Sequence, residues 1–99
     1  MTFIGLLFEF DPAKAASNLE KHRVSFREAM TVFNNPLAET FPDDLHSEEE
    51  DRSITIGLSS RQQLLFVVHG ERNSRIRLIG ARRANGTERK AYEELKARS

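Results

Sequence analysis

The sequence has 99 residues, a hydrophobic content of 38%, a formal net charge of zero and no cysteine. This length predicts a single domain spanning residues 1–99 with one modest core, and the absence of cysteine excludes disulfides and thiolate metal sites. The net charge by itself indicates no nucleic-acid partner. The apolar start at residues 3–8 is too short to span a bilayer and follows no basic segment, so we expect a cytoplasmic protein with no membrane partner.

The charges are nevertheless sorted along the chain. Residues 39–51 hold seven acids and no base, whereas residues 52–92 hold nine bases and two acids, which leaves a local net charge of +7. A basic half of this kind is typical of a surface that binds a polyanion. The acidic stretch at residues 39–51 can shield the basic surface, steer a partner toward it, or simply keep a loop solvated.

The first part of the chain predicts a strand and a helix. Residues 3–10 form a nearly continuous apolar run, which favours a buried strand over a short helix. Asp11, followed by proline, has the features of a helix N-cap. The face on which this helix packs is predicted from its apolar residues, Ala13, Ala16 and Leu19. The other faces then hold its polar residues: Lys14, Asn18, Lys21 and His22.

A second helix is predicted from residue 25, because residues 25–28 fit the capping-box pattern. One face of this helix carries Phe26, Ala29, Met30 and Phe33. The sequence Asn-Asn-Pro at residues 34–36 ends the helix. We expect a short strand at residues 37–41, followed by a loop through the acidic residues to Asp51.

The next part of the chain has the pattern of three antiparallel strands. Residues 53–58 alternate apolar with small or polar side chains, as in a half-buried strand. Residues 64–68 are all apolar, which predicts a central strand. After a turn at residues 70–74, the third strand is expected at residues 75–82.

Strand alternation places four residues of the third strand on one face: Ile76, Leu78, Gly80 and Arg82. Arg82 is therefore predicted to continue the row that faces the core. A guanidinium in such a place needs a partner or a function.

A final helix is predicted to begin at Asn85, which can cap it with Glu88 at the third position. Its apolar face holds only Ala91, Tyr92 and Leu95, so we expect this helix to dock weakly. Together the elements predict an α+β fold in which two N-terminal helices and a C-terminal helix lie against one face of an antiparallel sheet.

Several motifs along the chain form one recognisable set. They are Phe8 to Pro12, Lys21-His22, Val24 to Phe26, His46-Ser47, Ile56 to Ser59, Leu64 to His69, Ile79 to Ala84, and Glu88-Arg89. In combination they resemble the BrnT-type ribonuclease toxins. The chain departs from that pattern at Gln63, where arginine is frequent and would supply a phosphate contact, and at Gly80, where serine is common.

The resemblance implies a RelE-like fold and a small toxin of a type II toxin–antitoxin pair that cleaves RNA without a cofactor and stops translation. It also implies a BrnA-like antitoxin, a ribbon-helix-helix DNA-binding protein that covers the toxin. Operator DNA would then be contacted only through the complex of the two proteins.

Metal-free RNA cleavage needs a base for the ribose 2′-hydroxyl, an acid for the leaving oxygen, and cations for the charge that develops on phosphorus. The catalytic candidates are Arg82, Arg52, His22 and Glu88. Arg82 can contact phosphate, form a structural pair with Glu88, or do both. Arg52 either takes part in the site or neutralises the acidic loop. His22 either transfers protons or closes the end of its helix, where the helix dipole favours a cation.

The candidate RNA-binding residues are Lys14, Lys21, Arg61 and Arg83. Lys14 and Lys21 lie about two helical turns apart, on one side of the first helix, where they can track RNA or form a solvated face. Arg83 points away from the face of Arg82 and is expected to be solvated or to follow the RNA backbone.

Two other histidines have simpler interpretations. His46 with Asp43, Asp44 and Glu50 has no specific metal-ligand spacing, so we expect no metal site. His69 is expected to be a strand-end residue and not a catalyst. An alternative function is a noncatalytic protein-binding module that uses the basic strand and the C-terminal helix.

Overall fold

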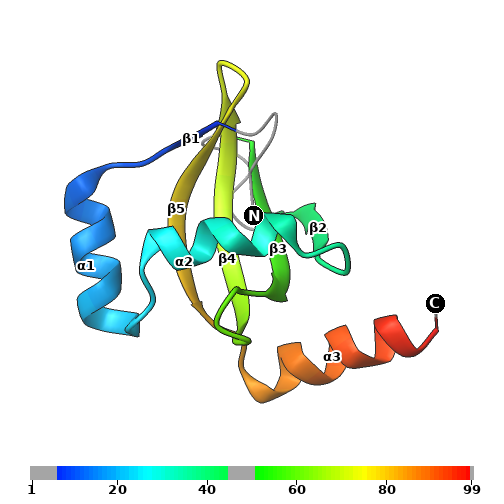
Figure 1. Ribbon diagram of the computed structural model, residues 1–99. Coiled ribbons are helices and arrows are strands. Elements are labelled where there is room, and N and C mark those ends of the chain that lie inside the picture. Colours follow the sequence, from blue (N-terminus) through cyan, green and yellow to red (C-terminus); the bar gives the residue numbers. More distant parts are fainter. Residues whose placement is uncertain (1–6, 45–50, 99) are drawn as a thin grey trace.

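The computed structural model describes residues 7–44 and 51–98. Within these residues, five strands form one sheet in the order β1-β5-β4-β3-β2 (Figure 1). The elements in chain order are β1 (Phe8–Glu9), α1 (Pro12–His22), α2 (Phe26–Thr31), the 3-10 helix η1 (Val32–Asn34), β2 (Glu39–Pro42), β3 (Arg52–Leu58), β4 (Leu64–Arg72), β5 (Arg75–Arg83) and α3 (Gly86–Ala97). The predicted α+β class is confirmed. The pairing is antiparallel except between β1 and β5.

The strand predictions hold with two changes. Of the predicted strand at residues 3–10, the described part forms only Phe8–Glu9, which is half-buried at the sheet edge. The other change is at the β4–β5 turn, where β4 runs on to Arg72. The turn therefore consists only of Asn73 and Ser74, whose φ angles of 53° and 63° suit a tight two-residue hairpin.

The predicted helix starts are confirmed by hydrogen bonds. The side chains of Asp11, Ser25 and Asn85 each accept a bond from a backbone N–H of the first helical turn, at 2.8, 2.9 and 2.8 Å. At Asn85 the capping box is complete, because the Glu88 carboxylate also accepts the Asn85 N–H at 2.9 Å. At Ser25 the carboxylate of Glu28 points elsewhere.

Glu28 is buried and ties α2 to the turn between β3 and β4. Its Oε2 accepts hydrogen bonds from Ser59 Oγ at 2.6 Å and from Gln63 Nε2 at 2.7 Å. Gln63, at which the chain departs from the BrnT-type pattern, therefore faces a buried carboxylate. Gln63 serves here as a structural partner of Glu28.

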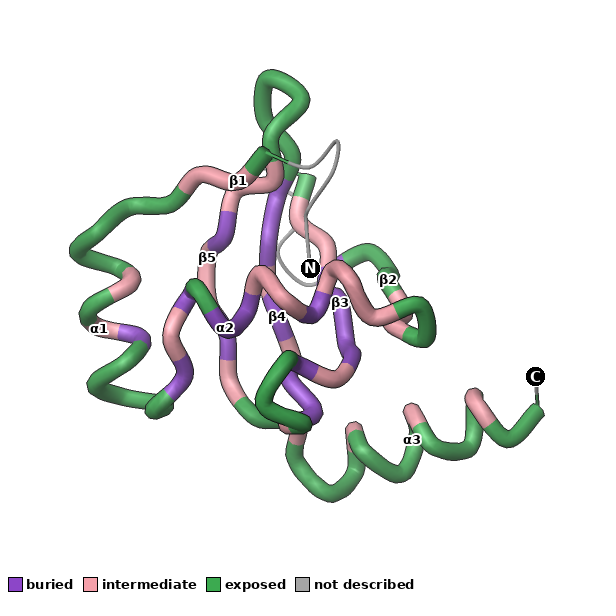
Figure 2. The backbone as a smooth tube through the Cα atoms, viewed as in Figure 1, coloured by how far each residue is buried: buried purple, intermediate pink, exposed green. Residues whose placement is uncertain are grey.

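Core residues lie on both faces of the sheet. Figure 2 shows that buried residues are concentrated in β3, β4, β5 and α2. The layer under α2, which includes the inward-facing residues of α2 itself, comprises Val24, Phe26, Ala29, Val32, Leu65, Val67, Leu78 and Ala81. On the other face Ile54, Ile56 and Leu64 are buried, and Phe66, Val68 and Tyr92 pack against them. Because Tyr92 belongs to α3, the prediction that the helices cover a single face is wrong. The prediction of a half-buried β3 is also wrong, since residues 54–57 are buried on both sides.

At Gly57, β3 passes close to the segment after α2. A Cβ atom added there would lie 2.8 Å from the Cβ of Ala38 and 3.1 Å from Cγ1 of Val32. Only a residue without a side chain fits at this distance.

The packing face of α1 differs from the prediction. Asn18 is only 8% exposed, whereas Leu19 is 49% exposed. The predicted apolar face of Ala13, Ala16 and Leu19 is exposed to solvent. The reason is that α1 lies beside β5 near the edge of the sheet, where unpaired backbone groups favour a polar partner over an apolar one.

Asn18 supplies that partner with both ends of its amide. Its Nδ2 donates to the carbonyl of Ala81 at 2.8 Å, and its Oδ1 accepts the Ala81 N–H at 3.1 Å. The same Nδ2 also donates to the carbonyl of Val24 at 2.9 Å. One buried side chain therefore holds α1, the start of α2 and β5 together.

An extra residue in β5 changes which side chains face the core. Leu78 and Gly80 pair with consecutive residues of β4, so Ile79 forms a bulge. Leu78 and Ala81 consequently both lie under α2. By alternation from Ala81, Gly80 and Arg82 face the opposite side of the sheet. The prediction that Arg82 continues the row of Leu78 is therefore wrong.

Candidate active site

Arg82 lies on the α3 face of the sheet and has several partners. Its guanidinium carbon is 4.1 Å from the ring centroid of Phe66, the residue opposite it in β4. Nη1 and Nη2 donate to the two carboxylate oxygens of Glu88 at 2.8 and 2.9 Å, and Nη1 also lies 3.3 Å from the carbonyl of Arg83. The structural pair with Glu88 considered from the sequence is present.

Both charges of this pair are stabilised. The hydrogen bond to Glu88 raises the pKa of Arg82, against the opposing effect of partial burial. The hydrogen bond from Arg82 lowers the pKa of Glu88, and the backbone N–H of Asn85 lowers it further. Glu88 is therefore ionised at neutral pH, as a fixed partner of the arginine requires.

The pair does not use the whole guanidinium. The three bonds occupy three of its five N–H groups. The other two lie on the edge formed by Nε and Nη2, with which an arginine can bind a phosphate through two parallel hydrogen bonds. Because 36% of the side chain is exposed, Arg82 can be held by Glu88 and contact an anion at once.

His22 and Arg82 border the same small hollow. It has a volume of about 140 Å³ and is lined by Asn18, His22, Phe66, Val68, Gly80, Ala81 and Arg82. The residues come from three elements: α1, β4 and β5. The imidazole of His22 and the fixed guanidinium of Arg82 therefore line one cavity together with the apolar side chains of Phe66 and Val68.

A wider groove joins this hollow along α1. It has a volume of about 360 Å³ and is lined by Lys14, Ser17, Asn18, Lys21, His22, Ile79 and Gly80. Asn18, His22 and Gly80 line both spaces, so the two spaces are adjacent. Lys14 and Lys21 lie on the same groove, as their predicted placement on one side of the helix requires.

The structure does not bring Arg52 to this hollow. Arg52 is the first residue of β3, and its carbonyl accepts the N–H of Asp43 at 2.9 Å. Arg82 is opposite Phe66, which is opposite Ile56, four residues farther along β3. Four strand residues correspond to about 13 Å.

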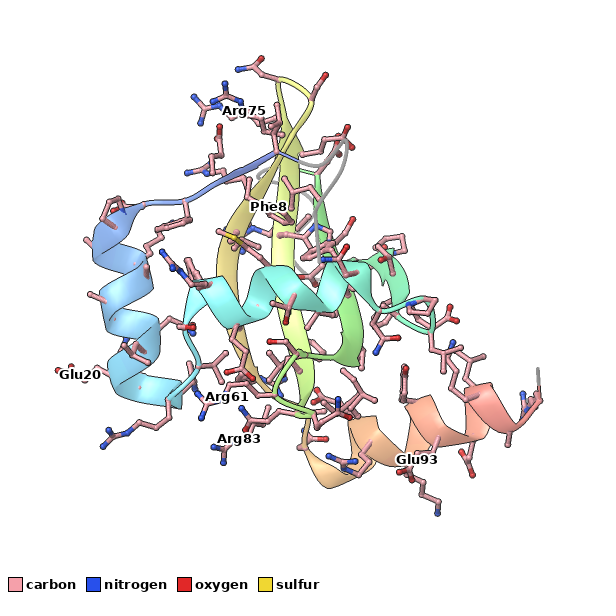
Figure 3. The ribbon with its side chains drawn as sticks, in the orientation of Figure 1. Phe8, Glu20, Arg61, Arg75, Arg83 and Glu93 are labelled. Carbon is pink, nitrogen blue, oxygen red and sulfur yellow. The ribbon has the colours of Figure 1, made fainter. Side chains whose placement is uncertain are left out.

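Arg61 and Arg83 lie at the same end of the sheet and do not line the hollow. Arg61 is exposed in the β3–β4 turn, and Arg83 is exposed at the end of β5. Figure 3 shows both at the end of the sheet from which α3 starts. Alternation along β5 puts Arg83 on the α2 side, opposite to Arg82, as predicted.

His69 has a structural environment. It is 8% exposed, its Nε2 lies 2.7 Å from Thr55 Oγ1, and its ring packs edge-on against Phe33 with the ring centroids 5.0 Å apart. Burial lowers the pKa of His69 to about 4, so the ring is neutral at neutral pH. The prediction that His69 ends its strand is wrong, because β4 continues to Arg72, and these contacts make His69 a buried residue within the strand.

Two residues of the site were missed in the sequence. Phe66 gave no signal beyond its place in an apolar strand. Asn18 was assigned to a face of α1 other than the packing face, yet Lys14, Asn18 and His22 recur every four residues, which places them on one helix face. That spacing could have joined Asn18 to the candidate site.

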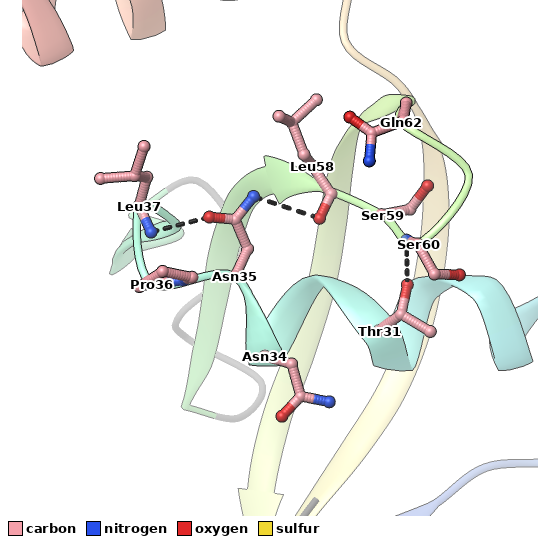
Figure 4. Close-up of a pocket in the computed structure, with 9 residues that line it drawn as sticks. All are labelled: Thr31, Asn34, Asn35, Pro36, Leu37, Leu58, Ser59, Ser60 and Gln62. Atoms are coloured by element: carbon pink, nitrogen blue, oxygen red, sulfur yellow. Dashed lines mark hydrogen bonds between the residues drawn. The ribbon is translucent and has the colours of Figure 1, made fainter. Parts of the chain in front are cut away.

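Another cavity, of about 470 Å³, lies between the end of α2 and the β3–β4 turn (Figure 4). Its lining residues carry amide, hydroxyl and apolar groups and no charge: Thr31, Asn34, Asn35, Pro36, Leu37, Leu58, Ser59, Ser60 and Gln62. This lining provides neither a titratable group nor a cation for phosphate chemistry.

Metal-ligand clusters and membrane-spanning helices are absent from the part of the chain that the structure describes. Residues 7–44 and 51–98 contain no group of three or more His, Asp or Glu side chains that could hold a metal ion. His46 and Glu50, of the metal set considered from the sequence, lie outside these ranges. No helix in the described ranges has the length and apolarity that crossing a membrane requires.

Comparison with known proteins places the chain in a family. A sequence model described as "Ribonuclease toxin, BrnT, of type II toxin-antitoxin system" matches residues 10–88. The crystal structure of the Brucella abortus ribonuclease toxin BrnT is similar in fold, with a TM-score of 0.65 at 22% identity over 81% of this chain and 97% of that chain. No curated protein matches the chain. Because the family match covers most of the sequence, the chain belongs to the BrnT family, the ribonuclease toxins of type II toxin–antitoxin systems.

Proposed function

We propose that this toxin is a metal-independent endoribonuclease with a RelE-like active site, which cuts RNA in the cytoplasm and thereby stops translation. The observation that carries the proposal is the shared hollow of His22 and Arg82. An imidazole can take or give a proton near neutral pH, and a fixed guanidinium can stabilise charge on phosphorus.

In this mechanism the ribose 2′-oxygen attacks the adjacent phosphorus and the 5′-oxygen of the next nucleotide leaves. His22 takes the 2′-hydroxyl proton or protonates the leaving oxygen, and solvent water makes the other proton transfer. The free edge of Arg82 binds the phosphoryl oxygens as their negative charge increases. Because the leaving group departs as a 5′-hydroxyl, the other product is a 2′,3′-cyclic phosphate.

Glu88 acts in the proposal as a positioning residue. It fixes the guanidinium through two short hydrogen bonds and is itself fixed by the capping box at Asn85. An ionised carboxylate in this pair has no proton to donate at neutral pH, so Glu88 is not the general acid.

The remaining cations bind the flanking RNA. Lys14 and Lys21 line the groove that leads into the hollow and can contact backbone phosphates there. Arg61 and Arg83 extend the cationic surface at the end of the sheet. For Arg52, the distance along β3 favours a contact with a more distant phosphate over a place at the cut bond.

Cleavage of labelled single-stranded RNA by the purified protein, with a metal chelator present, tests the mechanism. Arg82→Ala and His22→Gln should each lower kcat/KM by about 100-fold or more, whereas Arg98→Ala, at the exposed end of α3, should not. Unchanged cleavage by both site variants would refute the assignment. Loss of cleavage by the wild type on chelation would refute metal independence.

The antitoxin is proposed to be BrnA-like, a ribbon-helix-helix protein that contacts operator DNA as part of the complex. A second surface supports partner binding: an apolar groove of about 420 Å³ between α3 and β2, β3 and β4, which includes the exposed side chains of Phe41 and Leu95. No residue of α3 is buried, which supports the expectation that this helix docks weakly. Growth arrest that a neighbouring ribbon-helix-helix gene fails to relieve would contradict this partner. A protein that binds a partner but never cuts RNA would instead be the noncatalytic module.

A further inference from the structure

The hollow beside Arg82 exists because residue 80 has no side chain. A Cβ atom at Gly80 would meet one atom within 4 Å, the Oδ1 of Asn18, at an ordinary contact distance of 3.7 Å. The backbone of Gly80 has a conformation that other residues adopt without strain. Neither packing nor backbone geometry therefore requires glycine here, and what glycine provides is the space itself.

The walls of this space have two kinds of chemistry. Phe66 and Val68, neighbours of Gly80 in β4, form an apolar floor, and His22 and Arg82 form a polar rim. A nucleotide has the complementary structure, with a flat ring beside an anionic phosphate. A volume of about 140 Å³ is close to that of cavities that hold one six-membered ring.

The hollow also has one extended approach. The groove that carries Lys14 and Lys21 ends at Gly80 and His22. An RNA strand along these lysines would reach the hollow with its phosphates on the cationic side. One nucleotide can then turn inward while the next phosphate meets Arg82.

We propose that the hollow over Gly80 receives the base of one nucleotide of single-stranded RNA and thereby places the adjoining phosphate on Arg82. This inference rests on the proposed ribonuclease function and adds a base-binding subsite to it. A base in the hollow cannot remain stacked in a duplex, so double-stranded RNA is a poor substrate.

The test fills the hollow from its floor. Gly80→Ala, Gly80→Val and Gly80→Leu place one, three and four side-chain carbons in it. Gly86→Leu is the matched control, because a Cβ at Gly86 has nothing within 4 Å. The probe is a fluorescein-labelled single-stranded RNA of mixed sequence, and the same RNA annealed to its complement.

We expect kcat/KM on the single strand to fall progressively through the Gly80 series, by about 100-fold for the leucine variant, with the Gly86 control close to the wild type. The melting temperature of the valine variant should not fall, because a β-branched residue suits a strand. The wild type should cut the duplex about 100-fold more slowly than the single strand.

Full cleavage by folded Gly80→Val and Gly80→Leu would overturn the subsite, as would equal cutting of duplex and single strand by the wild type. Either result leaves the ribonuclease proposal intact, provided that the wild type cuts RNA and Arg82→Ala does not. A wild type that cuts no RNA would instead remove the proposed function.

Discussion

Acidification should destabilise this protein through His69. The ring is buried, its Nε2 is bonded to Thr55, and the Thr55 hydroxyl lies 2.7 Å from that of Thr40. Burial lowers the pKa of His69 from 6.5 to about 4. Between these pH values the unfolded chain binds a proton that the folded protein does not, so the free energy of unfolding falls as the pH falls from 6.5 to 4.

The size of the effect follows from the separation of the two pKa values. They differ by about 2.5 pH units, and each unit corresponds to about 1.4 kcal/mol, so the full loss is about 3 kcal/mol. At about pH 4.5, where the folded form is only partly protonated, most of this loss is expected. Above pH 6.5 this contribution is constant, because neither state carries the proton.

Urea unfolding measured between about pH 4 and pH 7.5 checks this value. The carboxylates titrate in the same range, so the control is His69→Gln, which can still bond to Thr55 but binds no proton. On acidification, the free energy of unfolding of the wild type should fall by about 3 kcal/mol more than that of the variant. If the free energies of unfolding of the two proteins changed in parallel with pH, the assignment of the acid destabilisation to His69 would be refuted.

Three further changes test the packing of the site. Asn18→Asp puts a carboxylate against two carbonyl oxygens and should lower the free energy of unfolding by about 2–4 kcal/mol in urea titrations, and a loss no larger than 1 kcal/mol would contradict its bridging role. Gly57→Ala forces a Cβ against a neighbouring alanine at 2.8 Å and should cost about 1–3 kcal/mol by the same measurement, while Gly86→Ala, on an open helix surface, should cost nothing. Glu88→Gln keeps the shape of the partner of Arg82 but not its charge. It should lower kcat by about 10-fold with little change in KM, and an unchanged kcat would refute the positioning role.

Local features of the sequence predicted the helix starts correctly, because Asp11, Ser25 and Asn85 bond to amides within the same turn. The pair of Arg82 and Glu88 was also accessible, since the two residues flank one capped helix start. These interactions depend on few residues that are close in the chain, and propensity decides them.

The errors have a different origin. The face of α1, the side on which α3 docks and the orientation of Arg82 depend on contacts between elements far apart in the sequence. Asn18 meets Ala81 across 63 positions of the chain, and no pattern within α1 alone indicates that its partner is the edge of a strand. The shared hollow of His22 and Arg82 could not be predicted from either residue for the same reason.

The bulge at Ile79 determines which mutations in this part of the chain are harmful. If β5 kept all its residues but lost the bulge, strict alternation would turn Arg82 toward the layer under α2 and bring Ala81 to the side of the hollow. A shift of the β4–β5 pairing by one residue at this end of β5 would therefore bury the charge of Arg82 and remove Arg82 from its site in one step. Deleting Ile79 would remove the bulge together with the extra residue, so the pairs on either side of it, and with them the face of Arg82, would stay as they are.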